Sequence, residues 1–383
     1  MSSSEKCFKR ILIILGGYLP GYKYGGPVQT VKNMTDCLGD EYDFRVLTVD
    51  RDYGDSTAYP HIRHQEWNTV GKTKVWYVPP DGFTKEVLMQ LAKEADLIYV
   101  FGCYENYARL VMRLKRNGKL YQPVVMSPMG CFSPGAFQIK WLKKKTYITV
   151  CRLLGWFRNV VWCVTGEQDR QDVWRIIGKS ATCYLAENIP RRMESLPKPI
   201  PKEKGMLRVV FLSRISPKKN LDYAIEVLQK IKGDVIFDIY GVMENTEYYS
   251  VCEERIKALP ENVVCQYRGG VEAHCTLEIF GQYHVFLFPT KGENFGHVIY
   301  EAMAGGCIPV ISDQCPWGDL EGKKAGRVLP LEDQGAYLKA VQELIDMDSE
   351  QYEQWQKRAV EYAWEFGQHA DGSGYRKVFE LGN

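Results

Sequence analysis

Short apolar runs alternate with helix-like stretches along the whole chain. The runs are short enough for strands that are buried on both faces of a sheet. In the first half they predict strands at Ile11–Leu15, Phe44–Val49, Leu97–Phe101, Pro123–Ser127 and Val160–Val164. In the second half they predict strands at Leu207–Leu212, Val235–Tyr240, Val263–Tyr267, Val285–Phe288 and Ile308–Ile311. This alternation is typical of parallel sheets covered by helices, so the fold class is α/β with two Rossmann-like, doubly wound domains facing a central cleft.

The join between the two series is expected in a proline-rich stretch, residues 187–202. Its prolines, Pro190, Pro197, Pro199 and Pro201, disfavour both helix and central strand. The first domain is therefore expected over residues 1–190 and the second over residues 191–365. Ligands of open α/β sheets bind beyond the carboxyl ends of the strands, so the loops that follow strands should hold the functional residues.

Length and composition fit a two-domain globular protein. The chain has 383 residues and no apolar stretch long enough to cross a membrane. Residues 1–7 lead into a short strand-like run and do not resemble a secretion signal. The twelve cysteines form no C-x-x-C pair, which favours reduced thiols in a cytoplasmic protein over a disulfide framework or a zinc site.

Two glutamates seven residues apart stand directly after one predicted strand. Glu293 follows the run Val285–Phe288, and Glu301 is expected about two turns into the next helix. Backbone N–H groups of Asn294–Gly296 would face outward at the positive end of that helix, which suits a diphosphate. Glu301 would reach a sugar or ribose hydroxyl. A surface helix with two solvated acids is the alternative.

This segment and the residues after it suggest a family. Residues 293–303, 305–313 and 314–320 resemble the E-x7-E region of retaining GT-B glycosyltransferases of family 4, the "group 1" type. The likeness is to members that build bacterial capsule, O-antigen or exopolysaccharide. It implies a retaining hexosyltransferase with a nucleoside diphosphate sugar as donor, UDP by default, and a lipid-linked or oligosaccharide acceptor. It also implies that a C-terminal helix, about residues 366–383, returns to the first domain.

A second constellation follows the first strand of the second domain. Arg214 and Lys219 match the two cations that hold the donor diphosphate in this family. Negative charge builds on the leaving nucleoside diphosphate as the glycosidic bond breaks, and fixed cations stabilise it. Arg offers a planar fork and Lys a compact charge. The resemblance further implies that Glu293 contacts the donor sugar, whereas Lys218 is expected to be a solvated neighbour.

A glycine-rich loop, residues 16–27, follows the first strand. Its spacing is not that of a dinucleotide fingerprint, and a plain turn is the alternative. By resemblance, Gly17, Gly25 and Gly26 would approach the donor phosphates and the acceptor.

The first domain departs from the family pattern at two positions. Phe101 stands where relatives often have His, and Met129 where they often have Arg or His. Glu105 and Asn106 are the nearest polar substitutes. A retaining front-face mechanism, which the resemblance implies, tolerates the change because the leaving phosphate oxygen can accept the proton of the acceptor.

No metal or other cofactor is expected. Asp50-Arg51-Asp52 has the form of a D-x-D metal motif, but it stands in the first domain, far along the chain from the phosphate-binding residues. It is interpreted as a solvated loop. The six histidines show no ligand-like spacing.

Positive charge is concentrated in the first half of the chain. The first 198 residues carry 29 Lys and Arg against 19 Asp and Glu, and residues 106–166 carry eleven basic residues and no acid. Within them, residues 136–158 mix basic and aromatic side chains in a pattern that suits an anionic inner-membrane surface. A core-packed helix with a solvated basic face is the alternative. No nucleic-acid-binding motif accompanies the charge.

These predictions describe a cytoplasmic glycosyltransferase, with a peripheral position on the inner face of the plasma membrane as a further expectation. Two other functions stay open at this point. A GT-B nucleotide-sugar epimerase would share the fold and the donor site. A non-catalytic GT-B scaffold would fit the absence of His at Phe101 but not the presence of Arg214, Lys219, Glu293 and Glu301 together.

Overall fold

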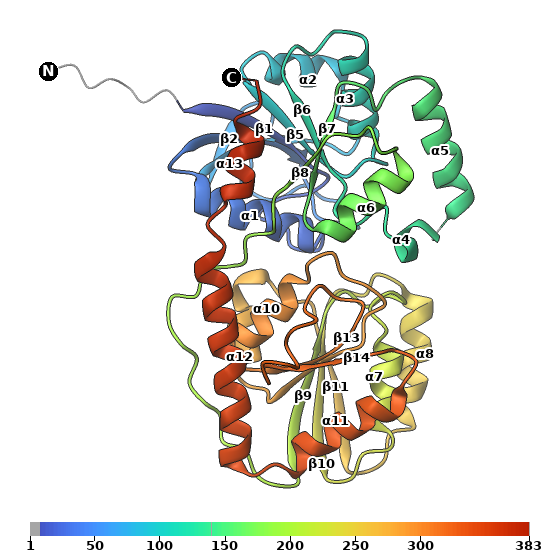
Figure 1. Ribbon diagram of the computed structural model, residues 1–383, viewed down its shortest axis with the longest axis vertical. Coiled ribbons are helices and arrows are strands. Elements are labelled where there is room, and N and C mark those ends of the chain that lie inside the picture. Colours follow the sequence, from blue (N-terminus) through green and yellow to red (C-terminus); the bar gives the residue numbers. More distant parts are fainter. Residues whose placement is uncertain (1–7, 139, 383) are drawn as a thin grey trace, which may run out of the picture. The chain divides into compact units, whose positions relative to one another are not determined.

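The computed structural model describes residues 8–138 and 140–382, which form two compact α/β units (Figure 1). One unit contains the described residues up to Ile189 and those from Ala370 onward, and the other contains Pro190–His369. The chain therefore passes from one unit to the other after Ile189 and after His369. The sequence predicts these two points at residue 190 and near residue 366. Residues 1–7, Ile139 of the basic segment and residue 383 lie outside the described residues.

The first unit is built on an eight-stranded sheet in the order β3-β4-β2-β1-β5-β6-β7-β8. Its strands are β1 Lys9–Ile14, β2 Tyr42–Val49, β3 Trp67–Val70, β4 Thr73–Val78, β5 Leu97–Phe101, β6 Val124–Ser127, β7 Val161–Val164 and β8 Cys183–Leu185. Its helices are α1 Gly26–Leu38, α2 Lys85–Ala92, α3 Asn106–Arg116, α4 Pro134–Gln138, α5 Trp141–Leu153, α6 Glu167–Ile176 and α13 Ser373–Phe379. All neighbouring strands pair in parallel except β3 and β4.

The end of the chain belongs to this first unit. The returning helix was predicted from about residue 366, but α12 continues to His369, and Gly372, which has a φ of 76°, precedes α13. The following helix α13 buries Phe379, whose ring lies edge-on to Tyr42, Phe44 and Tyr99. These aromatic contacts anchor the returning segment to the sheet.

The second unit has a six-stranded parallel sheet in the order β11-β10-β9-β12-β13-β14. Its strands are β9 Met206–Leu212, β10 Asp234–Tyr240, β11 Val263–Gly269, β12 Val285–Phe288, β13 Ile308–Ser312 and β14 Arg327–Leu329. Its helices are α7 Leu221–Leu228, α8 Thr246–Lys257, α9 Thr276–Phe280, α10 His297–Ala304, α11 Gln334–Asp346 and α12 Ser349–His369, with a single 3₁₀ turn at Ala273–Cys275. The chain winds outward from β9 in one direction and from β12 in the other.

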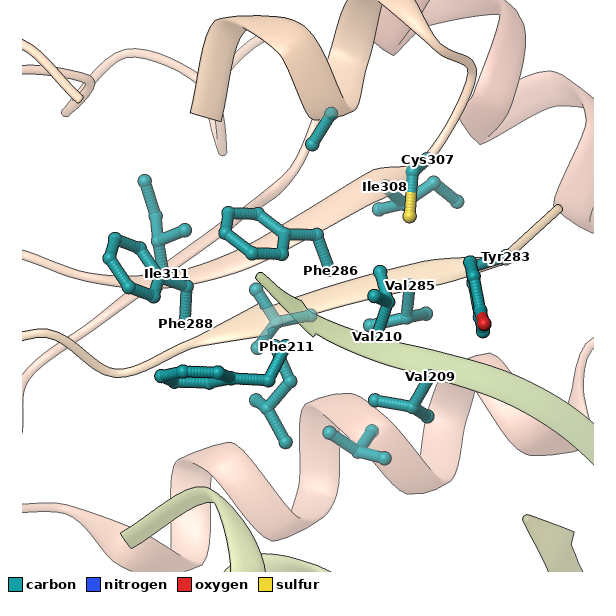
Figure 2. Close-up of a cluster of buried hydrophobic side chains, with 14 of the residues drawn as sticks. Val209, Val210, Phe211, Tyr283, Val285, Phe286, Phe288, Cys307, Ile308 and Ile311 are labelled. Carbon is teal, nitrogen blue, oxygen red and sulfur yellow. The ribbon is translucent and has the colours of Figure 1, made fainter. Parts of the chain in front are cut away.

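The central strands of this unit are buried on both faces. Figure 2 shows side chains of β9, β12 and β13 packed together, with Phe211 and Phe288 lying close to each other. The rings of Phe286 and Phe288 stack with centroids 5.1 Å apart, and Phe211 meets Phe288 at 5.8 Å. Continuous apolar runs are expected for strands in this position, because neither face meets water.

All ten strands predicted from the sequence are present. Four more were missed: β3, β4, β8 and β14. β8 and β14 have three residues each, which is too short for a periodic signal. β3 and β4 form a hairpin, and its polar residues interrupt the apolar pattern that would predict strands. The apolar run Val75–Val78 nevertheless indicates β4. Within residues 8–138 and 140–382, no helix is long and apolar enough to cross a membrane.

Candidate functional site

The second unit has a topological switch point between β9 and β12. The loop after β9 (residues 213–220) and the loop after β12 (residues 289–296) both leave the carboxyl edge of the sheet there. Open α/β sheets bind their ligands at such a point because the two loops diverge and leave a crevice between them. Six predicted site residues stand in these two loops: Arg214, Lys219, Glu293, Asn294, Phe295 and Gly296.

Lys219 and Glu293 form an ion pair across the switch point. Lys219 Nζ lies 2.5 Å from Glu293 Oε1, and each side chain is 12% exposed. Thr290 Oγ1 donates to the same carboxylate oxygen at 3.1 Å, and the Lys219 ammonium lies 5.5 Å from the centre of the Phe288 ring. Burial alone would raise the pKa of Glu293, but the positive charges of Lys219 and Lys218 lower it below its usual value. Glu293 is therefore ionised at neutral pH.

Hydrogen bonds fasten the loops that carry this pair. Asn220, with a φ of 63°, donates from Nδ2 to the carbonyl of Pro289 at 2.9 Å. Ser312 Oγ donates to the carbonyl of Thr290 at 2.5 Å, and the amide of Glu293 donates to the carbonyl of Gln314 at 3.1 Å. Loops from β9, β12 and β13 are thus tied into one framework. A framework of this kind holds charges in place before a ligand arrives.

Arg214 stands at the same edge but is paired differently. Its Nη1 lies 3.1 Å from Glu244 Oε1, and the side chains are 38% and 28% exposed. Such exposed pairs contribute little to stability. Glu244 therefore orients the guanidinium without occupying all of its five donors, and the remaining donors can meet an anion.

Helix α10 begins immediately after the loop that contains Glu293. Gly296 precedes it with a φ of 80° and a ψ of 61°. This positive φ favours glycine, and a Cβ atom here would also lie 2.8 Å from Ile299 Cδ1. The first N–H groups of a helix have no partner within the helix and carry its positive dipole end. The predicted anion-binding amides of Asn294, Phe295 and Gly296 lie at this terminus.

Glu301 lies one turn into α10, not two as predicted, because the helix begins only at His297. It is 6% exposed, so the alternative of a solvated acid is wrong for this residue. Burial raises the pKa of Glu301 to about 7, although Arg191 and Thr276 act in the opposite direction. Burial also lowers the pKa of the neighbouring His297 to about 4, which keeps that imidazole neutral near pH 7.

The glycine-rich loop of the first unit follows β1. Gly25 precedes α1 with a φ of 72°, and a Cβ atom at Gly17 would lie 2.0 Å from the ring of Tyr24. The positive φ favours glycine at Gly25, and the close Tyr24 ring favours it at Gly17. Gly26 differs, since a Cβ atom there would meet no atom within 4 Å. The predicted contacts of these three residues with a donor stay predictions.

The D-x-D motif is buried, so its interpretation as a solvated loop is wrong. Asp50 is 3% exposed and Asp52 is 5% exposed. Asp52 accepts hydrogen bonds from the backbone amides of Tyr22, Lys23 and Tyr53 at 2.8–3.1 Å. It therefore holds the glycine-rich loop. Hydrogen bonds from Arg51 and His64 lower the pKa of Asp50, against the effect of burial.

The other loops at the carboxyl edge of the first sheet are mostly apolar. The carbonyl of Phe101 accepts a hydrogen bond from Tyr107 Oη at 2.9 Å, and Met129 has a φ of 49°. Glu105 directly precedes α3 and Asn106 is its first residue, and both are exposed. Lys218, in the other unit, is exposed as predicted.

Sequence reasoning missed one buried acid at this edge. Asp169, on the first turn of α6, is 5% exposed and accepts hydrogen bonds from the amides of Gly130 and Thr165 at 3.3 and 3.2 Å. Burial raises the pKa of Asp169 to about 6. Its place in the first turn after β7 was visible in the sequence, but nothing there indicated that it is buried.

No group of three His, Cys, Asp or Glu side chains among the described residues is arranged to hold a metal ion. The cysteines of the described part are free thiols, and Cys103 Sγ lies 3.3 Å from Cys131 Sγ without a disulfide bond.

Comparison with known proteins supports the architecture. Residues 193–362 match the family model described as "Glycosyl transferases group 1". A search among curated proteins finds no significant match. Sucrose-phosphate synthase from Thermosynechococcus elongatus is similar with a TM-score of 0.69 at 15% identity, covering 97% of this chain and 99% of that chain.

Two further solved structures are similar over nearly the whole chain. WaaG, a glycosyltransferase involved in lipopolysaccharide biosynthesis, has a TM-score of 0.69 at 13% identity and covers 97% and 100% of the two chains. HepE of Anabaena in complex with UDP and glucose has a TM-score of 0.70 at 16% identity and covers 97% and 98%. The predicted GT-B fold, with two α/β domains, is confirmed.

Proposed function

We infer that this chain is a glycosyltransferase that moves a sugar from a nucleoside diphosphate sugar to an acceptor with retention of configuration. The single observation that supports this most is the charged pair of Lys219 and Glu293 at the switch point of the second sheet. The match of residues 193–362 to the group 1 family model supports the same activity.

The chemistry assigned to each residue follows from its place. Arg214 and Lys219 would face the diphosphate and stabilise the negative charge that grows on it as the glycosidic bond breaks. The amides of Asn294–Gly296 would bind the phosphates at the start of α10. Glu293, already held by Lys219 and Thr290, would hydrogen-bond the donor sugar. Glu301 would accept a hydrogen bond from the ribose.

We favour UDP as the nucleotide, because the similar HepE structures are complexes with UDP and with UDP-glucose. No divalent metal is assigned to the reaction, since the two cations and the helix amides supply the positive charge. Retention would proceed on the front face of the sugar, with the leaving phosphate oxygen accepting the proton of the acceptor. This route requires no catalytic base at Phe101 or Met129.

The acceptor we propose is a lipid-linked saccharide or an oligosaccharide in bacterial surface-polysaccharide assembly, on the cytoplasmic side of the membrane. The involvement of the similar protein WaaG in lipopolysaccharide biosynthesis supports this class. A hexose is the proposed transferred sugar.

Incubation of the protein with UDP-sugars, with and without acceptor, tests this function. A transferase forms a new glycoside only when acceptor is present and at most slowly hydrolyses the donor alone. An epimerase would convert the donor sugar without acceptor, and a non-catalytic scaffold would leave every donor unchanged. Either of those outcomes would replace the proposal.

A further inference from the structure

Helix α5 has few contacts with the core of its unit. Of its thirteen residues, Trp141–Leu153, only Ile148 and Cys151 are buried. Figure 1 shows the helix at the margin of its unit, separated from the sheet by other helices. An amphipathic helix of a globular domain normally covers a broad apolar stripe with protein. Most of α5 is not covered in this way.

The apolar side chains of α5 point away from the protein. Leu142 is 62% exposed, Val150 43% and Leu153 82%, and Leu154 at the end of the helix is 50% exposed. At 100° per residue, Leu142, Val150 and Leu153 lie on the side opposite the buried Ile148 and Cys151. The alternative of a core-packed helix is therefore wrong for these residues. Together with Trp141, they are five of the thirteen large hydrophobic residues that are exposed in the described part of the chain.

Positive charge flanks this apolar stripe. Lys145 and Arg152 lie along one side of it, and Lys143 lies along the other. None of these three forms an ion pair with a carboxylate of residues 8–138 or 140–382, and residues 106–166 contain no acid. Lys144 points inward instead, donating to the carbonyl of Ala136 at 2.6 Å and lying 5.2 Å from the Tyr104 ring.

The charged surface continues beyond the end of the helix. Arg152 and Arg158 line a groove of about 800 Å³ that also contains Asn159, Ser180 and Thr182. Arg116, from the end of α3, lies beside Arg158 at Gly155. A phosphate headgroup has the charge and the hydrogen-bonding capacity that match such a groove.

We propose that α5 docks this protein on an anionic lipid bilayer, lying in the membrane interface with Leu142, Val150, Leu153 and Leu154 inserted between headgroups. An apolar stripe with cations along both sides fits a surface that is negatively charged outside and apolar beneath. A nucleic acid would match the charge but not the central leucines. A protein partner is the other possible occupant, and the experiment below distinguishes it.

The docking itself is independent of donor chemistry, but its purpose rests on the proposed function. A transferase whose acceptor carries a lipid must act at the membrane surface. Reversible binding through one interfacial helix would hold the enzyme there and still allow it to leave.

Vesicle flotation of the full chain tests the proposal. Wild-type protein should float with vesicles of equimolar phosphatidylglycerol and phosphatidylcholine, and not with phosphatidylcholine alone. Lys145→Gln and Arg152→Gln should each weaken binding about fivefold, the usual contribution of one basic residue near such a surface. Leu142→Ser with Leu153→Ser should weaken it at least about tenfold, since each buried leucine contributes a similar or larger factor.

Leu196→Ser provides a matched control, because Leu196 is 63% exposed and lies in the second unit. It should float like the wild type. Absence of flotation with either vesicle, equal flotation with both, or unchanged flotation of the α5 variants would overturn the proposal and favour a protein partner for this face. UDP binding measured by calorimetry on the same preparations reports on the proposed function separately.

Discussion

The carboxyl edges of the two sheets differ in how polar side chains are used. In the second unit, Lys219, Glu293 and Asn220 connect the loops after β9 and β12 to each other. In the first unit, the corresponding loops after β1 and β5 present glycines and Phe101, and the acid Asp52 serves only to fasten the glycine-rich loop. The paired charges that link two strand-end loops thus lie in the second unit, and under the proposed function the first unit would contribute mainly shape and backbone.

Replacement of Lys219 should show the largest effect of this asymmetry. Lys219→Ala removes the cation that pairs with Glu293 and that, in the proposed function, faces the leaving diphosphate. Transfer should therefore fall by about 10²–10³-fold, as for other fixed charges at a reacting centre. Steady-state rates measure it. Lys339→Ala is the control, because Lys339 is an exposed lysine on α11 outside both loops, and it should stay within about fivefold of the wild type. Equal losses in both variants would contradict a specific role for Lys219.

Glu301 should show opposite effects on stability and on donor binding. Its pKa is raised from 4.5 to about 7, so the folded protein holds a proton there more tightly than the unfolded chain does. Stability from this group is complete below pH 4.5 and is lost as pH rises through 7, by up to about 3 kcal/mol.

Glu301→Gln should therefore raise the melting temperature at pH 8 by several degrees, leave it unchanged near pH 4.5, and weaken UDP binding. Scanning calorimetry at both pH values measures the first two effects. A variant that is less stable than the wild type at pH 8 would contradict the assignment of a strained, buried carboxylate.

In the first unit, Asp52 should affect folding more than chemistry. Asp52→Asn replaces a carboxylate that accepts three backbone amides, so the unit should lose about 1–3 kcal/mol of stability. Denaturant unfolding measures this loss. Asp55→Asn, which removes only an exposed pair with Lys23, is the control and should cost less than about 1 kcal/mol. If EDTA abolished transfer in the wild type, this motif would instead have to be considered as a metal site.

The smallest effect is expected for Glu105, the exposed acid at the carboxyl edge of the first sheet. Glu105→Gln should change the turnover rate by less than about tenfold, because the front-face route needs no base from this unit. Comparison of rates with that of the Asn106→Ala variant tests it. A loss as large as that of Lys219→Ala would remove the asymmetry and assign a proton-transfer role to Glu105.

The sequence predicted much of the fold because buried parallel strands leave continuous apolar runs such as Val285–Phe288. It missed β8 and β14, whose three residues carry no periodicity, and the β3–β4 hairpin, in which polar residues interrupt the pattern. The choice of Lys219 and Glu293 came from a resemblance, and the structure adds their pairing.

Burial was the property that could not be predicted from the sequence. Asp52 was interpreted as part of a solvated loop, and a solvated acid was the alternative left open for Glu301, yet both are buried. A carboxylate in a loop or on a helix gives no sign in the sequence of which neighbours cover it. The same limit applied to α5. The sequence of α5 contains both apolar and basic residues, and it does not show which of them face the protein. Only the burial of Ile148 and Cys151 shows that Leu142, Val150 and Leu153 face outward.

Calorimetric titration of the intact protein with UDP tests the donor site most directly. The site predicts saturable binding of UDP that Lys219→Ala weakens at least about tenfold, because one charge-assisted contact to phosphate is lost. Absence of binding for UDP, GDP and their sugars at millimolar concentration would contradict it.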